Sequence, residues 1–285
     1  MTTPRTATPF VRRSLDELTI GDEASLRHVG LYVDLKEVLR RADYPFRVLP
    51  KSRAPRNDRA LLLNLTYWSP DAGGDLLVDD RIEADVVAHT AWHYLAARSL
   101  SSRAGAAPSA DALFLGEAIA SAFDIYLVGR LLGHAPRSRF LASQVPAMAE
   151  AASAAGLPAR GFERLLGRVA DDPDRAFADL RELLSDAAAS LYACDTAERG
   201  YNALAALDAH PFSALLHRYE ISNWVLYARA YGARAPVDAR ARSVDRALRR
   251  AKAPLDWLAE HWVAPALSAL PAPGSPHGRS RRRPA

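Results

Sequence analysis

The apolar positions between residues 82 and 132 predict two long helices that are buried over most of their surface. In residues 82–100, apolar side chains occupy nearly every face of the helical period instead of a single stripe, which is typical of a helix inside a protein core. A second apolar helix continues to about Leu132, before Gly133, and Ser109 or Asp111 can cap its start. The small, polar residues 101–108 are expected to link the two helices.

Short apolar runs ahead of these helices predict a small sheet. The expected strands are residues 46–49, 60–68 and 75–79, with a turn at 70–74 between the last two. A helical period over residues 31–41 predicts one helix before the sheet, and a stop follows at 42–45. The basic, proline-containing residues 51–59 are interpreted as a loop.

The pattern beyond residue 133 is helical throughout, with breaks at Gly and Pro. Six helices are expected, at residues 137–155, 158–169, 173–192, 211–230, 237–252 and 254–270. We therefore predict an α+β, mostly helical fold, with a strand-containing lobe at 14–132 and a helical lobe at 133–270. The ends are rich in Pro and polar residues, which predicts a flexible N-terminus at 1–13 and a disordered basic tail at 271–285.

Charge and cysteine content narrow the classes of function. The 37 Lys and Arg residues exceed the 33 Asp and Glu residues by four. Four arginines lie in the tail, at Arg279, Arg281, Arg282 and Arg283. Without them the charges balance, so a nucleic-acid role is expected at most for this tail. The single Cys194 excludes an internal disulfide and a cysteine-based zinc cluster. We find no leader-like segment at residues 1–14 and no run of about 18 uncharged apolar residues, and we expect a cytoplasmic protein with no membrane role.

The first apolar helix carries the strongest candidate chemistry. His89 and His93 are four residues apart, so their imidazoles leave one face of the helix and can reach the same ion. Glu117, on the second helix, can add a third ligand, and an open fourth position would make the site catalytic in type. The alternative is that both histidines are hydrogen-bonded core residues, which is common in a buried helix.

Two stretches carry a resemblance to a known family. Asp-Val-Val-Ala-His at residues 85–89, followed by His93, and Glu-Ala-Ile at residues 117–119, followed by Phe123, resemble the gluzincin metallopeptidases, thermolysin-like enzymes in particular. The resemblance covers Asp85 to Leu132. It implies a zincin-like fold for the first lobe and one zinc ion held by His89, His93 and Glu117.

Three positions depart from the family pattern. Thr90 stands where the family has the glutamate that acts as general base, and such assistance is worth about 10²- to 10⁴-fold in rate. Gly116 replaces an asparagine, and Ser121 replaces an aspartate that supports a histidine ligand, which commonly costs about 10- to 100-fold in metal affinity. Neither Asp85 nor Asp124 is expected to replace the base. The family residue matched by Asp85 is not the base, and seven residues set Asp124 roughly 10 Å along the helix from Glu117.

Family members also stabilise the oxyanion with a histidine or tyrosine from the helical lobe. The candidates in this chain are His210, His217, Tyr219 and Tyr201, and none of them matches a motif. His217 is also close enough to Glu220 in sequence for an ordinary contact within one helix.

The leading hypothesis is a zinc-binding, gluzincin-like protein that is catalytically degenerate and binds a peptide or carboxylate ligand. A rival from another class is a metal-free helical module that binds a protein partner. A third possibility is a metallohydrolase with an unrecognised general base. The first two hypotheses predict different geometries. If His89, His93 and Glu117 are ligands, their head groups must converge within about 3 to 4 Å of one point, whereas divergent head groups would favour the metal-free module.

Overall fold

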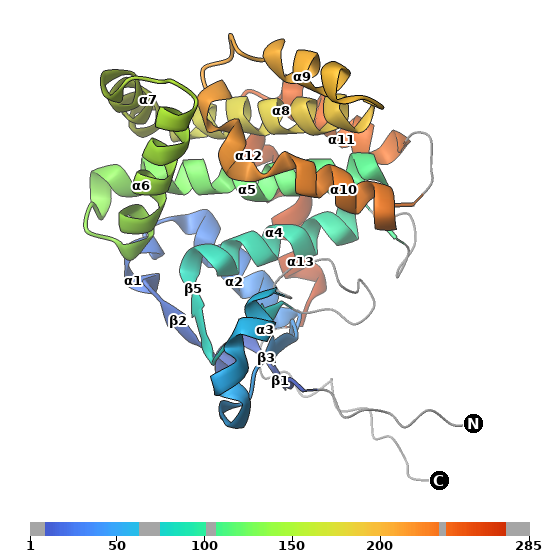
Figure 1. Cartoon of the computed structure of the whole chain (residues 1–285). Helices are drawn as coiled ribbons and strands as arrows, with labels where there is room; N and C mark the ends of the chain where they lie inside the picture. The colour runs from blue at the N-terminus through green and yellow to red at the C-terminus, as the bar shows by residue number, and fades with distance from the viewer. Residues whose placement is uncertain (1–8, 63–74, 101–106, 234–237, 272–285) are drawn as a thin grey trace.

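A computed structural model describes residues 9–62, 75–100, 107–233 and 238–271. Of these residues, 73% are helical and 7% lie in strands, so the fold is α+β and mostly helical, as predicted. Figure 1 shows the helices α4 (Ala84–Leu100) and α5 (Ala110–His134) near the centre, with the strands below them and most of the later helices above.

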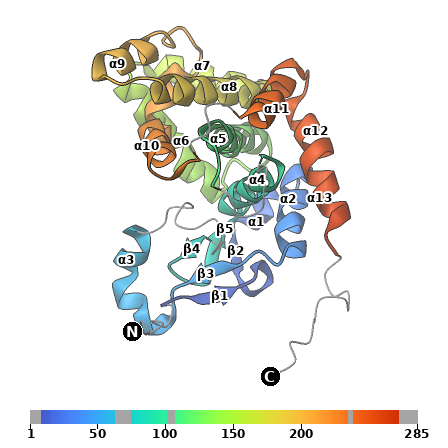
Figure 2. The ribbon, with the colours of Figure 1, turned by 90° about the vertical axis from the view of Figure 1, so that its right-hand side faces the viewer.

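The N-terminal part alternates short strands with helices. Its elements are β1 (Val11–Arg13), a 3₁₀ turn (Leu15–Glu17), β2 (Thr19–Gly21), α1 (Glu23–Leu26), α2 (Gly30–Arg41), β3 (Phe46–Val48), a 3₁₀ helix (Lys51–Arg56), α3 (Asn57–Leu62), β4 (Leu76–Leu77), β5 (Arg81–Glu83) and α4 (Ala84–Leu100). Strand β3 pairs antiparallel with β1 and parallel with β4, while β2 and β5 form a separate parallel pair. Figure 2 shows β1, β3 and β4 side by side below α4.

The rest of the chain is helical. Its elements are α5 (Ala110–His134), α6 (Arg139–Ala154), α7 (Ala159–Asp171), α8 (Pro173–Tyr192), α9 (Ala197–Ala205), a 3₁₀ helix (Ser213–Tyr219), α10 (Ile221–Tyr231), α11 (Ala239–Arg250), α12 (Pro254–Leu258), a π-helical turn (Ala259–Val263) and α13 (Ala264–Ala269). Helix α13 returns to α2, where Arg41 Nη1 donates a hydrogen bond of 2.8 Å to the carbonyl of Leu267. The last helix therefore packs against the strand-containing part of the chain.

Helix α5 forms the middle of the core. It packs against α4 on one side and α8 on the other, and Trp92 of α4 meets Phe123 of α5 edge to face with ring centroids 5.5 Å apart. Ser109 caps the helix by accepting a hydrogen bond from the backbone N–H of Ala112, as predicted. By length and composition α5 could cross a membrane, but 94% of its apolar window is buried inside the protein. The core helix of a soluble protein has the same properties.

Several sequence-based expectations need correction. Residues 60–62 continue α3 instead of starting a strand, because a short leucine run fits a helix as well as a strand. The rest of that expected strand, residues 63–68, and the turn at 70–74 lie outside the described residues. The expected loop at 51–59 is a 3₁₀ helix followed by the start of α3. Residues 11–13, expected to be loose, pair with β3.

The helix expected at residues 211–230 is also interrupted. Glu220 has a left-handed backbone with φ of +46°, which no sequence signal marks because glycine or asparagine usually occupies such positions. The interruption separates the 3₁₀ helix from α10 and gives the two segments different directions. Helix α9 was not expected at all, although Thr196 caps it.

Candidate metal centre

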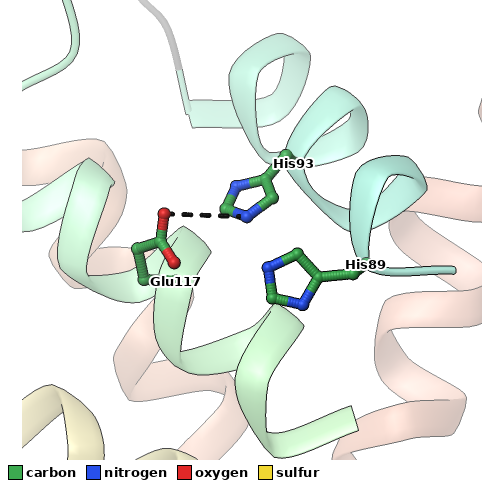
Figure 3. A group of neighbouring side chains, drawn as sticks. All are labelled: His89, His93 and Glu117. Carbon is green, nitrogen blue, oxygen red and sulfur yellow. Dashed lines mark ion pairs between the residues drawn. The ribbon is translucent and has the colours of Figure 1, made fainter. Parts of the chain in front are cut away.

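The side chains of His89, His93 and Glu117 converge between α4 and α5 (Figure 3). Each residue offers one ligand atom, and the three atoms lie within 4.8 Å of one another. In the part of the chain that the structure describes, these residues are the one group of three or more His, Cys, Asp or Glu side chains placed to hold a metal ion. The structure thus brings together the three residues that the sequence singled out.

The contact between His93 and Glu117 has the spacing of two ligands that share an ion. Nε2 of His93 lies 3.6 Å from Oε1 of Glu117, which is too long for a hydrogen bond. Two ligands of a tetrahedral zinc ion, each about 2.0 to 2.1 Å from it, stand roughly 3.4 Å apart. Nε2 is buried and has no hydrogen-bond partner among the described residues, so this nitrogen fits a metal ligand better than a satisfied core group.

Close packing of the two helices sets the position of Glu117. A Cβ atom added to Gly116 would lie 3.2 Å from Cβ of Ala96 on α4. The missing side chain therefore lets α5 approach α4 one residue before the glutamate. This contact gives a physical reason for glycine at the position where the gluzincin pattern has asparagine.

Burial shifts all three candidate ligands toward their neutral forms. It lowers the pKa of His89 to about 4 and raises the pKa of Glu117 to about 8. The pKa of His93 falls well below its usual value, mainly through burial and also through the neighbouring His89. Neutral imidazoles are the form that binds metal, and a cation would return the glutamate to its anion. The side chain of His93 remains 16% exposed as a whole, although its Nε2 atom is buried.

Thr90, at the position where the gluzincin pattern has a glutamate, forms a buried hydrogen bond. Its side chain is buried, and Oγ1 donates a hydrogen bond of 2.8 Å to Oδ2 of Asp75. Asp75 directly precedes the short strand β4 and is 9% exposed. The sequence reasoning missed this carboxyl group, because fifteen residues and a turn separate it from Thr90 and no spacing rule connects them.

Asp124 lies in a second polar cluster, seven residues further along α5 than Glu117. Burial raises the pKa of Asp124 well above its usual value, the charge of Asp85 adds to the rise, and Arg218 opposes it. Asp124 therefore interacts electrostatically with Asp85 of α4 and with Arg218 of the 3₁₀ helix. Ser121, between them on α5, is buried.

We expect Asp124→Asn to stabilise the protein at neutral pH and to have little effect near pH 4. The folded-state pKa of Asp124 lies above the unfolded value, so the folded state holds a proton that the unfolded state releases, and wild-type stability falls as pH rises through this window. Asparagine removes this dependence, and the gain at pH 7 should be about 1 kcal/mol or more. Urea unfolding of both proteins at several pH values measures it. A stability difference that does not grow with pH would contradict the raised pKa.

The four oxyanion candidates lie away from the triad. Tyr201 is 76% exposed and His217 is also exposed. His210 accepts a hydrogen bond from the backbone N–H of Phe212, and Tyr219 is partly buried near Arg218 and Asp124. The described contacts join none of the four to the metal ligands.

Tyr227 of α10 is the tyrosine that lies near the centre, and sequence reasoning did not single it out. Burial raises the pKa of its hydroxyl, and the neighbouring Tyr231 and the carboxyl group of Glu117 contribute to the rise. Only the packing of α10 against α5 brings Tyr227 to Glu117. The helical lobe therefore supplies a phenolic side chain that interacts electrostatically with Glu117.

Comparison with family models, with characterised proteins and with solved structures finds no match for this chain. The function must therefore be argued from the centre itself.

Proposed function

We propose that the protein binds zinc through His89, His93 and Glu117, and that it is a zincin-like, gluzincin-related protein. The observation that carries the proposal is the convergence of three ligand atoms within 4.8 Å of one another, with Nε2 of His93 buried and unpaired among the described residues. Three atoms at such spacing can all lie within about 3 Å of a common point, as ligands must.

The donor set favours zinc over calcium and magnesium. Two imidazole nitrogens and one carboxylate oxygen form a known catalytic zinc set with an open fourth position. Calcium and magnesium prefer oxygen ligands alone. Zinc at this centre would polarise a carbonyl or carboxylate bound at its open position. We therefore expect the ligand to be a peptide or another carboxylate-bearing molecule.

Peptidase chemistry by the gluzincin route is expected to be reduced. A threonine hydroxyl cannot take a proton at neutral pH as a glutamate does, and general-base assistance is worth about 10²- to 10⁴-fold. The protein is thus proposed as a metal-binding relative in which position 90 no longer performs this role.

The metal-free alternative is less well supported. It requires both histidines to be satisfied by hydrogen bonds, yet Nε2 of His93 lacks a partner among the described residues.

Elemental analysis of purified, tag-free protein tests the proposal. The wild type is expected to contain near-stoichiometric zinc, and the variant His89→Ala/His93→Ala is expected to contain none. The control variant His28→Ala/His134→Ala also removes two imidazoles, which are exposed and lie next to each other with ring centroids 4.7 Å apart and ring planes tilted by 58°. This control should keep its zinc. Equal zinc content in the wild type and the His89/His93 variant would rule out the proposed centre.

A further inference from the structure

The buried carboxyl group of Asp75 is hydrogen-bonded to helix α4 at Thr90, the residue directly after His89. Oδ2 of Asp75 accepts a hydrogen bond of 2.8 Å from Thr90 Oγ1, and Tyr44 Oη lies 3.5 Å from the same oxygen. The backbone carbonyl of Asp75 accepts a hydrogen bond of 2.9 Å from the N–H of Arg47 on β3. Sheet and helix together fix the position of this carboxyl group.

Thr90 and His93 are neighbours on the surface of α4. Successive helical residues are turned by about 100°, so Thr90 lies about 60° around the helix from His93. His93 in turn contacts Glu117. Thr90 therefore borders the histidine that is closest to the third ligand.

The threonine and the aspartate together extend about as far from the helix as one glutamate side chain. In a glutamate, two carbon atoms separate Cβ from the carboxylate oxygens. At position 90 the hydroxyl oxygen and one hydrogen bond span a similar length. A carboxylate oxygen from the segment before β4 therefore lies at a distance from α4 that a glutamate at position 90 could also reach.

We propose that Asp75 is the proton acceptor of the metal centre and that Thr90 is the residue that positions it. The inference rests on the proposed zinc site. A water molecule or an acidic ligand at the centre transfers a proton to Asp75, whose carboxylate becomes a carboxylic acid. The electron pair of the broken O–H bond stays on the oxygen of the water or ligand. That oxygen is then the nucleophile toward a carbonyl carbon or, in an inhibitor, the oxygen that binds the ion.

Acetohydroxamic acid is a suitable probe, because it loses a proton when it binds a metal ion. Isothermal titration calorimetry of zinc-loaded protein in two buffers of different ionisation enthalpy counts the protons released to solution. The wild type is expected to release almost none, since Asp75 takes the proton. Asp75→Asn is expected to release about one proton and to bind the probe about 10- to 100-fold more weakly, as expected for the loss of a hydrogen bond to a charged group.

Moving the carboxyl group provides the sharpest variant. In Asp75→Asn/Thr90→Glu the acid returns on α4 itself, and the proton release should fall back to almost none. Thr90→Val keeps Asp75 but removes its hydrogen-bond donor, so it should retain proton uptake with weaker binding. Asp80→Asn, which changes an exposed acid in the same segment, serves as the matched control and should behave as the wild type.

The outcomes separate the two proposals. Loss of zinc from the wild type overturns both. If zinc is bound but the wild type releases the full proton, or if Asp75→Asn behaves as the wild type, Asp75 is a purely structural residue and the inference fails alone. Should Asp75→Asn fail to fold, as judged by circular dichroism, the wild type and Thr90→Val still decide, because a purely structural Asp75 predicts that both release the full proton.

Discussion

Zinc added to the metal-free protein is expected to raise its melting temperature by about 10 °C, and Glu117→Gln is expected to abolish this rise. A ligand present at 1,000 times its dissociation constant stabilises the folded state by about 4 kcal/mol. For domains of about 150 to 250 residues, each kcal/mol corresponds to roughly 2 to 4 °C. Glutamine keeps the size of the side chain but lacks the anionic oxygen that the ion requires. Differential scanning calorimetry with and without zinc measures both effects.

The same substitution is expected to have the opposite effect on the metal-free protein. Burial raises the pKa of Glu117 to about 8 in the folded state, above its unfolded value. The folded state therefore holds a proton that the unfolded state releases, and stability falls as pH rises from about 4.5 toward 8. Glutamine avoids this loss, so the metal-free variant should melt above the metal-free wild type at pH 7. A variant that melts lower without zinc and still gains stability with zinc would contradict the assigned role of Glu117.

The second large effect is expected at Gly129, where α5 crosses the junction of α7 and α8. A Cβ atom at this position would lie 2.3 Å from the carbonyl oxygen of Val169 and 2.9 Å from side-chain carbons of Pro173. Because the nearest atom belongs to the backbone, a small side-chain adjustment cannot relieve the clash. We expect Gly129→Ala to lower the free energy of unfolding by about 3 kcal/mol, at the upper end of typical overpacking costs.

Gly133 on the same helix provides the matched control. No atom lies within 4 Å of a Cβ built there, and alanine is favoured over glycine in a helix by about 1 kcal/mol. Gly133→Ala should therefore leave stability unchanged or raise it. Urea denaturation of both variants measures the difference. Equal effects of the two substitutions would argue against the close crossing of α5 with α7 and α8.

Long, strongly periodic segments of the fold could be predicted from the sequence. The helix expected at residues 31–41 is α2, and the one expected at 173–192 is α8 with the same bounds. Strand β3 matches residues 46–49 closely. The pairs β1–β3 and β2–β5 were not foreseen, because these strands have three residues each and too few positions to show a period.

The candidate site was predictable to the extent that its residues lie on regular helices. The spacing of His89 and His93 fixes their shared face, and Glu117 follows on the next buried helix. Tyr227 and Asp75 could not be found in the same way. Tyr227 reaches Glu117 only through the packing of α10 on α5, and Asp75 reaches Thr90 only through the path of the chain before α4.

The third possibility raised by the sequence, a hydrolase with an unrecognised base, gains a specific candidate in Asp75. The hydrogen bond between Thr90 and Asp75 also means that the single substitution Thr90→Glu is not a simple restoration of the general base. A glutamate at position 90 would place a second carboxyl group against Asp75 in a buried site, where two like charges are unfavourable. The exchange of both residues is therefore the informative variant.

The ligands of the bound zinc ion test the central claim most directly. X-ray absorption spectroscopy of the zinc-loaded protein should show two imidazole nitrogens at about 2.0 to 2.1 Å and carboxylate oxygen at about 2.0 to 2.2 Å, with no sulfur. The imidazole signal should disappear in His89→Ala/His93→Ala. Sulfur from Cys194 in the spectrum, or an imidazole signal that survives this double substitution, would contradict a zinc centre formed by His89, His93 and Glu117.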